Sequence, residues 1–526
     1  MPAGNNAPGR LSSGEQEIMT DQHLSTPQEI ELKLDFPAEA HALVAQHVTL
    51  LENVAPVVHT HLVTIYYDTP DLALSRSGLS LRVRRSGRHH VQTLKSGGDN
   101  ALATHRNEWE WPVRTTRPDI TLLDATPAAI LKPMLDGKLV PVFRSDIQRA
   151  IHMMKCEDAV IEIAIDEGSV RAGKAEERVH EVELELKNGP VLPLYHLAIR
   201  LQADLPLHIS AQTKAGRGYR LLTGHSTQVT PARAPVLSAK ITAADGFRRI
   251  MREDMDSLVN NLPAVKADDM EGIHQMRVAI RRLRTTLQLF SVCLDDTKAT
   301  QFEDGLQRIG RILGAARDWD VFSTETLRTA SPALPMQDGW QALNTAATGL
   351  RTQAHNALQQ ELAGPDITAC VLALTAWMED APFRVSHKKM DHKLIALAPD
   401  LLDRVTRKVV RRGRHISHLS ATELHSLRKT LKKLRYSVDS MASLYPTRKV
   451  KSYLKHCRRL QSCLGDINDA AVALILTDRL RCIQPDLSTE ACDTVIRWSK
   501  KRRQQAMRRL PQAWSAFHKA TPFWRS

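Results

Sequence analysis

Charged and apolar residues alternate strictly in the stretch Glu29-Ile30-Glu31-Leu32-Lys33-Leu34. Side chains that alternate with a period of two lie on opposite faces of a β-strand. The same alternation recurs in Leu79–Arg85, Val91–Lys95, Arg106–Val113, Ile161–Asp166 and Val179–Lys187. These runs predict antiparallel strands, each with one apolar face and one charged face.

The charged faces carry both signs. Arg82 and Arg84 share one face, whereas Glu181, Glu183 and Glu185 share another. One interpretation is an open sheet whose charged face meets water and forms cross-strand ion pairs. The other is a closed barrel whose lumen holds a divalent metal with its acids and phosphate with its bases. Hard oxygen ligands favour Mg²⁺ or Mn²⁺ over zinc.

The pattern changes after residues 224–240, a predicted linker that contains Pro231 and Pro235. From about residue 241, apolar residues recur every three or four positions, which predicts an all-α region.

The helical region repeats itself at an offset of 151 residues. Two sets of mostly basic residues have the same internal spacing and are separated by this offset. The same offset relates Arg308 to Arg459 and Asp318 to Asp469. The two sets are His274, Arg277, Arg281 and Arg284, and His425, Arg428, Lys432 and Arg435. Steps of three and four residues put each set on one helix face. A single basic stripe is usually a solvated face, but two matched stripes favour a groove that follows a phosphate chain.

Charge is distributed unevenly over the 526 residues. Residues 1–230 carry 24 basic and 28 acidic residues, whereas residues 231–526 carry 48 and 30, a net charge of +18. A strongly basic domain implies a polyanionic partner, which could be nucleic acid, anionic lipid or a phosphate polymer. The length predicts more than one domain, and 42% hydrophobic residues are typical of globular proteins.

The remaining sequence features bear on the compartment. The seven cysteines form no C-x-x-C pair, so we expect neither disulfides nor zinc. Residues 1–26 are polar, which predicts disorder, and they lack the apolar run of a signal peptide. The longest apolar stretch, Ile367–Met378, is too short to span a bilayer. We expect a cytoplasmic protein without a membrane span, associated with polyphosphate-containing granules if it binds that polymer.

A further set of motifs runs in order from Gln28 to Leu222. It comprises E-x-E-x-K at Glu29, Glu31 and Lys33, then Arg82, Arg84, Lys95, Arg149, Asp166, Glu183 and Glu185, and finally Thr213-Lys214-Ala215-Gly216-Arg217-Gly218-Tyr219. With these motifs, residues 27–223 resemble the CYTH family of triphosphate tunnel metalloenzymes. The resemblance implies an eight-stranded antiparallel β-barrel that forms a tunnel, within a two-domain α+β chain.

The resemblance also implies metal-dependent hydrolysis of inorganic triphosphate to pyrophosphate and phosphate. The implied catalytic residues are Glu29, Glu31 and Lys33. The implied ligands of Mg²⁺ or Mn²⁺ are Glu29, Glu31, Asp166, Glu183 and Glu185, with the choice among Glu181, Glu183 and Glu185 left open. The implied substrate-binding residues are Lys33, Arg82, Arg84, Lys95, Arg106, Arg149 and Lys214. Thiamine triphosphatases and adenylate cyclases belong to the same family, so an organic triphosphate stays open, as does a polyphosphate receptor without turnover.

Residues 241–515, which precede a tail at residues 516–526, resemble the CHAD domain, a duplicated helical bundle found fused to CYTH enzymes. The whole chain thus resembles bacterial CYTH-CHAD inorganic triphosphatases. The resemblance implies polyphosphate binding by His274, Arg277, Arg281, Arg284, Arg308, His425, Arg428, Lys432, Arg435 and Arg459. Asp318 and Asp469 would orient the arginines. Nucleic acid is the less expected partner, because single-strand readers place aromatics among basic residues and the stripes offer only Tyr436, just past the second.

Overall fold

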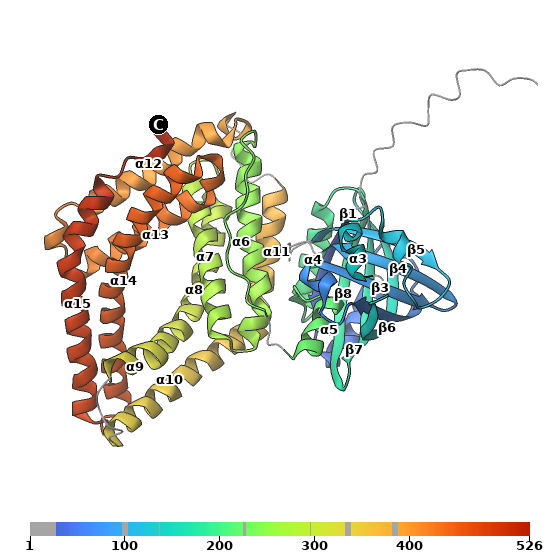
Figure 1. Ribbon diagram of the computed structural model, residues 1–526, viewed down its shortest axis with the longest axis horizontal. Coiled ribbons are helices and arrows are strands. Elements are labelled where there is room, and N and C mark those ends of the chain that lie inside the picture. Colours follow the sequence, from blue (N-terminus) through green and yellow to red (C-terminus); the bar gives the residue numbers. More distant parts are fainter. Residues whose placement is uncertain are drawn as a thin grey trace, which may run out of the picture.

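The computed structural model describes residues 28–96, 104–135, 137–224, 228–294, 296–331, 338–380 and 388–525 (Figure 1). A strand domain is followed by a helical domain, which confirms the predicted α+β class. Residues 1–26, predicted to be disordered, lie outside the described residues, as do residues 225–227 of the predicted linker. Among the helices in the described ranges, none is long and apolar enough to cross a membrane.

The strand domain contains one antiparallel sheet. Its long strands are β1 (Gln28–Asp35), β2 (Val58–Asp68), β3 (Leu79–Ser86), β4 (His89–Ser96), β5 (Thr104–Val113), β6 (Val140–Cys156), β7 (Ala159–Ala172) and β8 (Ala175–Asn188). They are ordered β5-β4-β3-β2-β6-β7-β8-β1, and the short β9 (His208–Ile209) also pairs with β1. The two ends of this order meet where β1 pairs with β5, from Gln28–Asn107 to Glu31–Thr104. The sheet is therefore curled around an interior, called the tunnel below, and its two ends pair over four residues.

The apolar faces of the strands pack against helices and loops. Leu32 and Leu34 of β1 share a core with buried residues of α1 (His41–Thr49) and α4 (Leu192–Asp204). Leu81 of β3 lies in another core with Leu123 and Leu135. Because side chains alternate along a strand, covering the apolar faces turns the charged faces toward the inside of the curled sheet.

The helical domain is a duplication. The corresponding helices are α6 (Ala243–Lys266) and α12 (Leu394–Arg412), α7 (Met270–Phe290) and α13 (Ala421–Ser440), α8 (Asp296–Asp320) and α14 (Thr447–Ile483), and α10 (Asp338–Ala363) and α15 (Thr489–His518). Each helix of the second copy begins 151 residues after its counterpart. This agreement confirms the predicted duplicated bundle.

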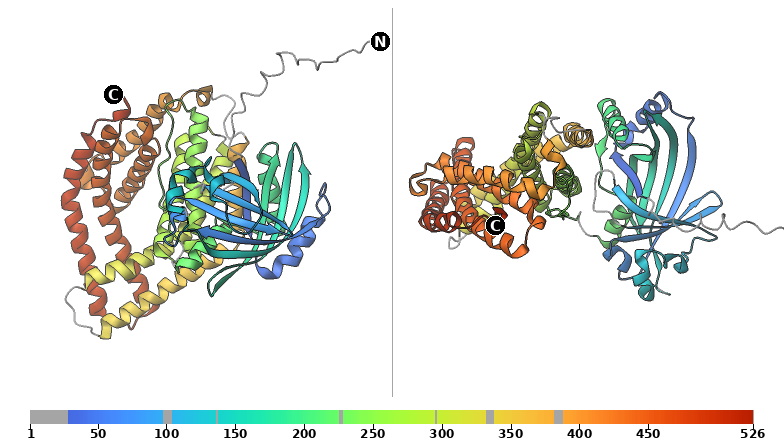
Figure 2. Two further views of the ribbon diagram at one scale, coloured as in Figure 1. Left: turned by 45° about the vertical axis from the view of Figure 1, so that its right-hand side comes forward. Right: turned by 90° about the horizontal axis from the view of Figure 1, so that it is seen from above.

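Helix α11 (Asp366–Glu379) of the helical domain contacts the strand domain. It packs against α4 of the strand domain, and the two helices lie where the domains meet in Figure 1. Figure 2 shows the two domains from two further sides. Gln202 Nε2 of α4 donates a hydrogen bond to the carbonyl oxygen of Pro365 at 3.3 Å. Buried residues of both domains form one continuous core, so the domains pack against each other directly.

Candidate functional site

The strand register brings the predicted tunnel residues together. Lys33 of β1 lies opposite Glu183 of β8. Asp166 of β7 lies opposite both Arg149 of β6 and Glu181 of β8. Directly opposed residues share a face of the sheet. Four neighbouring strands therefore contribute charged side chains to one surface.

This surface lines a cavity of about 420 Å³. Its lining includes the predicted residues Glu31, Lys33, Arg82, Arg84, Lys95, Arg149, Glu183, Glu185 and Lys214. The backbones of Glu29 and Arg106 pair with each other across β1 and β5, but the side chains of these two residues lie outside the described residues.

Burial decides between the two interpretations of the charged faces. Asp166 and Glu181 are fully buried, and Glu31, Arg82 and Lys214 are 6%, 8% and 8% exposed. A face that meets water would leave such groups exposed, because burying a charge is costly unless it is paired. The open-sheet interpretation is therefore wrong for these residues, which lie inside the tunnel.

Three carboxylates form a cluster that could hold a metal ion. One oxygen atom each from Asp166, Glu181 and Glu183 lie within 4.8 Å of one another. Burial opposes ionisation of Glu183, but Lys214 and Lys33 outweigh it and hold the pKa of Glu183 well below its usual range. An oxygen donor set of this kind suits Mg²⁺ or Mn²⁺.

The predicted ligands Glu31 and Glu185 lie beside this cluster. Lys33 Nζ contacts Glu31 at 2.5 Å, and Lys187 Nζ contacts Glu185 at 2.7 Å. The cluster thus contains Glu181 instead of Glu185, a choice that the sequence left open. The sequence analysis missed Lys187, which lines the cavity. It stands two residues after Glu185, so the period of two was the signal that could have identified it.

The Thr-Lys-x-x-Arg-Gly-Tyr motif begins helix α5 (Lys214–Thr223) at the tunnel. Thr213 caps the helix, because its side-chain oxygen accepts the Gly216 N–H at 2.9 Å. Lys214 contacts all three carboxylates of the cluster, and this contact raises its pKa against the effect of burial. Gly218 packs against the ring of Phe143, where a Cβ atom would come within 2.1 Å. The glycine therefore permits the close approach that places Lys214.

The arginine pair on β3 faces the same cavity. Arg82 Nη2 contacts Glu108 at 3.2 Å. Within the described ranges, no carboxylate pairs with Arg84, and the Nε atoms of both arginines are buried without a hydrogen-bond partner. Burial, Arg82 and Arg149 together lower the pKa of Arg84 to about 10. Among the described residues, the cavity thus contains a cation that forms no ion pair with a carboxylate.

The two basic stripes meet where α7 contacts α13. Burial lowers the pKa of Lys432 to about 6, and the neighbouring Arg281, Arg428 and Arg277 contribute to this shift. A hollow of about 490 Å³ lies beside the second stripe, and its lining includes Arg428, Lys432, Arg435, Arg458, Asp466 and Asp469.

Several stripe residues have local partners. Arg277 Nη1 lies 3.3 Å from Asp318, and Arg428 Nη2 lies 3.9 Å from Asp469, contacts that fit the orienting role expected of these aspartates. The other contacts are Arg284 with Glu303 at 3.2 Å, Arg435 with Asp439 at 2.9 Å, and His425 Nδ1 with Asn468 at 3.0 Å. Burial lowers the pKa of His274.

Arg308 and Arg459 lie apart from the hollow beside the second stripe. Arg308 pairs with Glu361 and with Asp366, at 2.7 Å in each case. Its counterpart Arg459 donates to the neutral amide of Gln512 at 2.8 Å. The equivalent arginines of the two copies therefore have different partners, carboxylates for Arg308 and an amide for Arg459.

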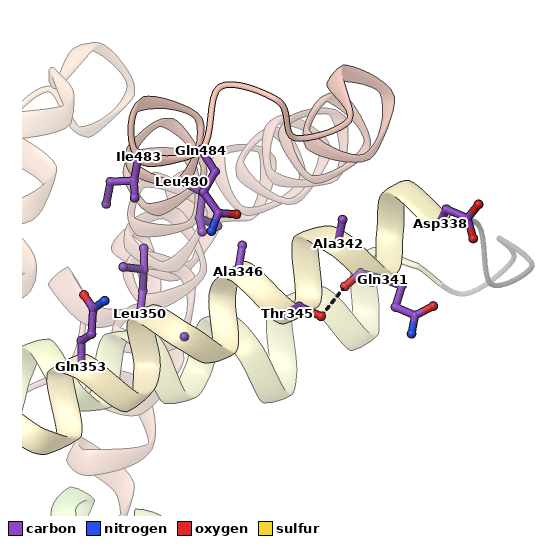
Figure 3. Close-up of a pocket in the computed structure, with 11 residues that line it drawn as sticks. Asp338, Gln341, Ala342, Thr345, Ala346, Leu350, Gln353, Leu480, Ile483 and Gln484 are labelled. Carbon is purple, nitrogen blue, oxygen red and sulfur yellow. Dashed lines mark hydrogen bonds between the residues drawn. The ribbon is translucent and has the colours of Figure 1, made fainter.

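A separate hollow of about 600 Å³ lies between α10 and the C-terminal end of α14 (Figure 3). Apolar side chains such as Leu350, Leu480 and Ile483 line it together with the amides of Gln341 and Gln353. None of its lining residues is basic, so it does not suit a phosphate ligand.

Comparisons with known proteins match both domains. Residues 27–219 match the model of the CYTH domain, and residues 249–481 match that of the CHAD domain. An inorganic triphosphatase from Haemophilus influenzae is 30% identical over 200 residues, which cover 37% of this chain and only 55% of that relative. An uncharacterised protein from Mycobacterium tuberculosis is 25% identical over 455 residues, 80% of this chain and 84% of that protein. The crystal structure of the CHAD domain from the plant Ricinus communis aligns with a TM-score of 0.49 and 28% identity, covering 56% of this chain and 98% of that one.

Proposed function

Because the chain joins a CYTH domain to a CHAD domain, we propose that its tunnel hydrolyses inorganic triphosphate to pyrophosphate and phosphate in the cytoplasm. The name of the Haemophilus influenzae relative supports this substrate, although the match covers only about half of that relative. The observation that carries the proposal is Arg84, which forms no ion pair with a carboxylate among the described residues and faces a cavity that also contains the acidic cluster. A triphosphate would supply acceptors for the buried Nε atoms of Arg82 and Arg84.

The carboxylates of Asp166, Glu181 and Glu183 would hold Mg²⁺ or Mn²⁺, because they are buried, close together and oxygen-only. An ion bound there would polarise the phosphoryl oxygens and activate the attacking water. The protein's own cations have two tasks. Lys33 and Lys214 keep Glu183 ionised, and Arg149 orients Asp166 through hydrogen bonds of 2.7 and 2.6 Å.

The remaining cations bind and neutralise the substrate. Arg82, Arg84 and Lys95 line the cavity and form no ion pair with the three carboxylates of the cluster among the described residues. Fixed positive groups in a buried site stabilise the charge that develops on the leaving pyrophosphate. Glu29, Glu31 and Arg106 keep the catalytic, metal-binding and substrate-binding roles that the family resemblance implies for them.

Replacing Arg84 tests the proposal, with phosphate release from triphosphate measured in the presence of Mg²⁺ or Mn²⁺. Arg84→Gln should lower kcat/KM about 100-fold, the usual effect of removing one group that stabilises charge in the transition state. The unfolding temperature should stay the same or rise, because the variant removes a buried charge that has no carboxylate partner among the described residues.

The matched control is Arg85→Gln, which removes the same charge from the exposed neighbouring residue and should keep wild-type activity. Activity retained by Arg84→Gln would contradict the tunnel assignment. Parallel assays with thiamine triphosphate and ATP test the organic-triphosphate alternative. Tight binding of polyphosphate without phosphate release would favour the receptor alternative.

We further propose that the helical domain binds polyphosphate along the two stripes. The contact of α7 with α13 supports this proposal, because it places Arg277, Arg281 and Arg428 close to Lys432, whose pKa is lowered by burial and by these three cations. Like charges held this close favour a polyanion that neutralises several of them at once.

A further inference from the structure

Helix α11 of the helical domain contacts the strand domain at a point that leads to the tunnel. The backbone N–H of Ile209 donates to Thr368 Oγ1 at 3.0 Å. The next backbone N–H, that of Ser210, donates to the carbonyl oxygen of Lys33 at 3.0 Å. Thr368, Ile209 and Ser210 are all buried. A side chain of the helical domain thus holds the segment that binds the backbone of a tunnel lysine.

The geometry of β9 strengthens this link. Ile209 pairs with Leu34 of β1, directly after Lys33. The side chain of Lys33 points into the cavity, where it contacts Glu31 and Glu183. A shift of Ile209 would therefore move β1 and change the position of the Lys33 ammonium relative to the acidic cluster.

Arginines of the helical domain fix both ends of α11. At its start, Arg308 pairs with Asp366 at 2.7 Å and also with Glu361 in the last turn of the preceding α10. At its end, Arg248 Nε donates to the carbonyl oxygen of Met378 at 3.0 Å, and Arg252 pairs with Glu379. The helix is thus held rigidly on the first copy of the duplication.

The second copy differs at the equivalent positions. Gln512 stands 151 residues after Glu361 and offers Arg459 an amide in place of a carboxylate. The carboxylates that engage Arg308 therefore belong to the copy that carries α11. We expect this difference if the first copy holds α11 in place and the second copy holds no such helix.

We propose that α11 is a positioning element of the tunnel: Thr368 sets the backbone of Lys33 through Ile209 and Ser210, and Arg308 fixes α11 for this purpose. The proposal deepens the triphosphatase function and rests on it. Thr368 and Arg308 do not touch the reacting atoms, so both are positioning residues.

Two variants of the full chain at Thr368 test the link. Thr368→Val removes the hydroxyl acceptor and should lower kcat/KM for triphosphate about tenfold, because small displacements far from the reacting atoms reduce catalysis. It should also raise the amide exchange rates of Ile209 and Ser210 about tenfold, as their hydrogen bonds open locally. Thr368→Ser keeps the acceptor and should restore both values. Wild-type activity in the valine variant, or equal loss in the serine variant, would overturn the proposal.

Arg308→Gln should raise the same two amide exchange rates. Its control is Arg311→Gln, an exposed arginine on the same helix, which should leave them unchanged. Unchanged exchange in Arg308→Gln would remove Arg308 from the proposal. The exchange measurement requires no turnover, so it distinguishes failure of this link from failure of the proposed function: a wild-type chain that releases no phosphate contradicts the function alone.

Discussion

At the scale of the single residue, Lys432 makes binding by the helical domain sensitive to pH. Its pKa of about 6 leaves the amine mostly neutral at pH 7.5. A phosphate chain bound beside it favours the ammonium form and raises this pKa. Binding then takes up a proton, so affinity for polyphosphate should fall as the pH rises from 6 to 8, by up to about tenfold per pH unit. Titrations with polyphosphate at fixed salt and three pH values measure this slope.

Lys432→Arg provides the control, because arginine stands at the equivalent position, Arg281, and stays charged over this pH range. This variant should bind with a flatter pH dependence. His274 and His425 also lie on the stripes. A slope that persists in Lys432→Arg would show that Lys432 does not take up the proton, which would contradict the prediction.

At the scale of the element, α7 and α13 should act as one binding surface. Replacing Arg277, Arg281, Arg428 and Arg435 together by Gln removes four cations that would neutralise phosphates. Each of these replacements should flatten the slope of log K against log salt by about 0.7, the value for single-stranded polyanions. Affinity should therefore fall most strongly at low salt. Titration of polyphosphate at several salt concentrations gives both quantities.

The matched control changes the same number of charges elsewhere. Lys500, Lys501, Arg503 and Arg508 are exposed on α15, which carries neither stripe. Replacing these four by Gln should leave affinity within about twofold and the salt slope nearly unchanged. If both quadruple variants weaken binding equally, net charge and not the stripes is responsible.

The elements also show what the sequence could and could not predict. Alternation identified β1, β3, β4, β5, β7 and β8, because a period of two is a local property of a strand. The alternation did not identify β2 and β6. The outer faces of these strands carry polar residues such as His59 and Gln148 among the apolar ones, so the period of two is interrupted. The composition of the acidic cluster depends on the register of β7 against β8, which separates Glu181 from Glu185. The role of α11 was not predicted, because its contacts join segments about 160 residues apart.

At the scale of the whole molecule, the packing of α4 against α11 should make the tunnel depend on the helical domain. A fragment of residues 1–230 lacks Thr368 and exposes the face of α4 that contacts α11. It should unfold at a lower temperature than the full chain and hydrolyse triphosphate more slowly, because buried apolar contacts and one buried hydrogen bond are removed. Calorimetry and a phosphate-release assay of fragment and full chain measure both effects. A fragment with full activity and stability would show that the domains are energetically independent.

The constant offset of 151 residues has a consequence for symmetry. Two identical subunits of a twofold dimer must share every substitution, because one coding sequence specifies both. Fusion of the two copies into one polypeptide lifts this constraint. Arginine can then stand at position 281 while lysine stands at 432, and glutamate at 361 while glutamine stands at 512. The helix α11 that packs against the strand domain follows the first copy, so each chain joins one strand domain to one pair of helical copies.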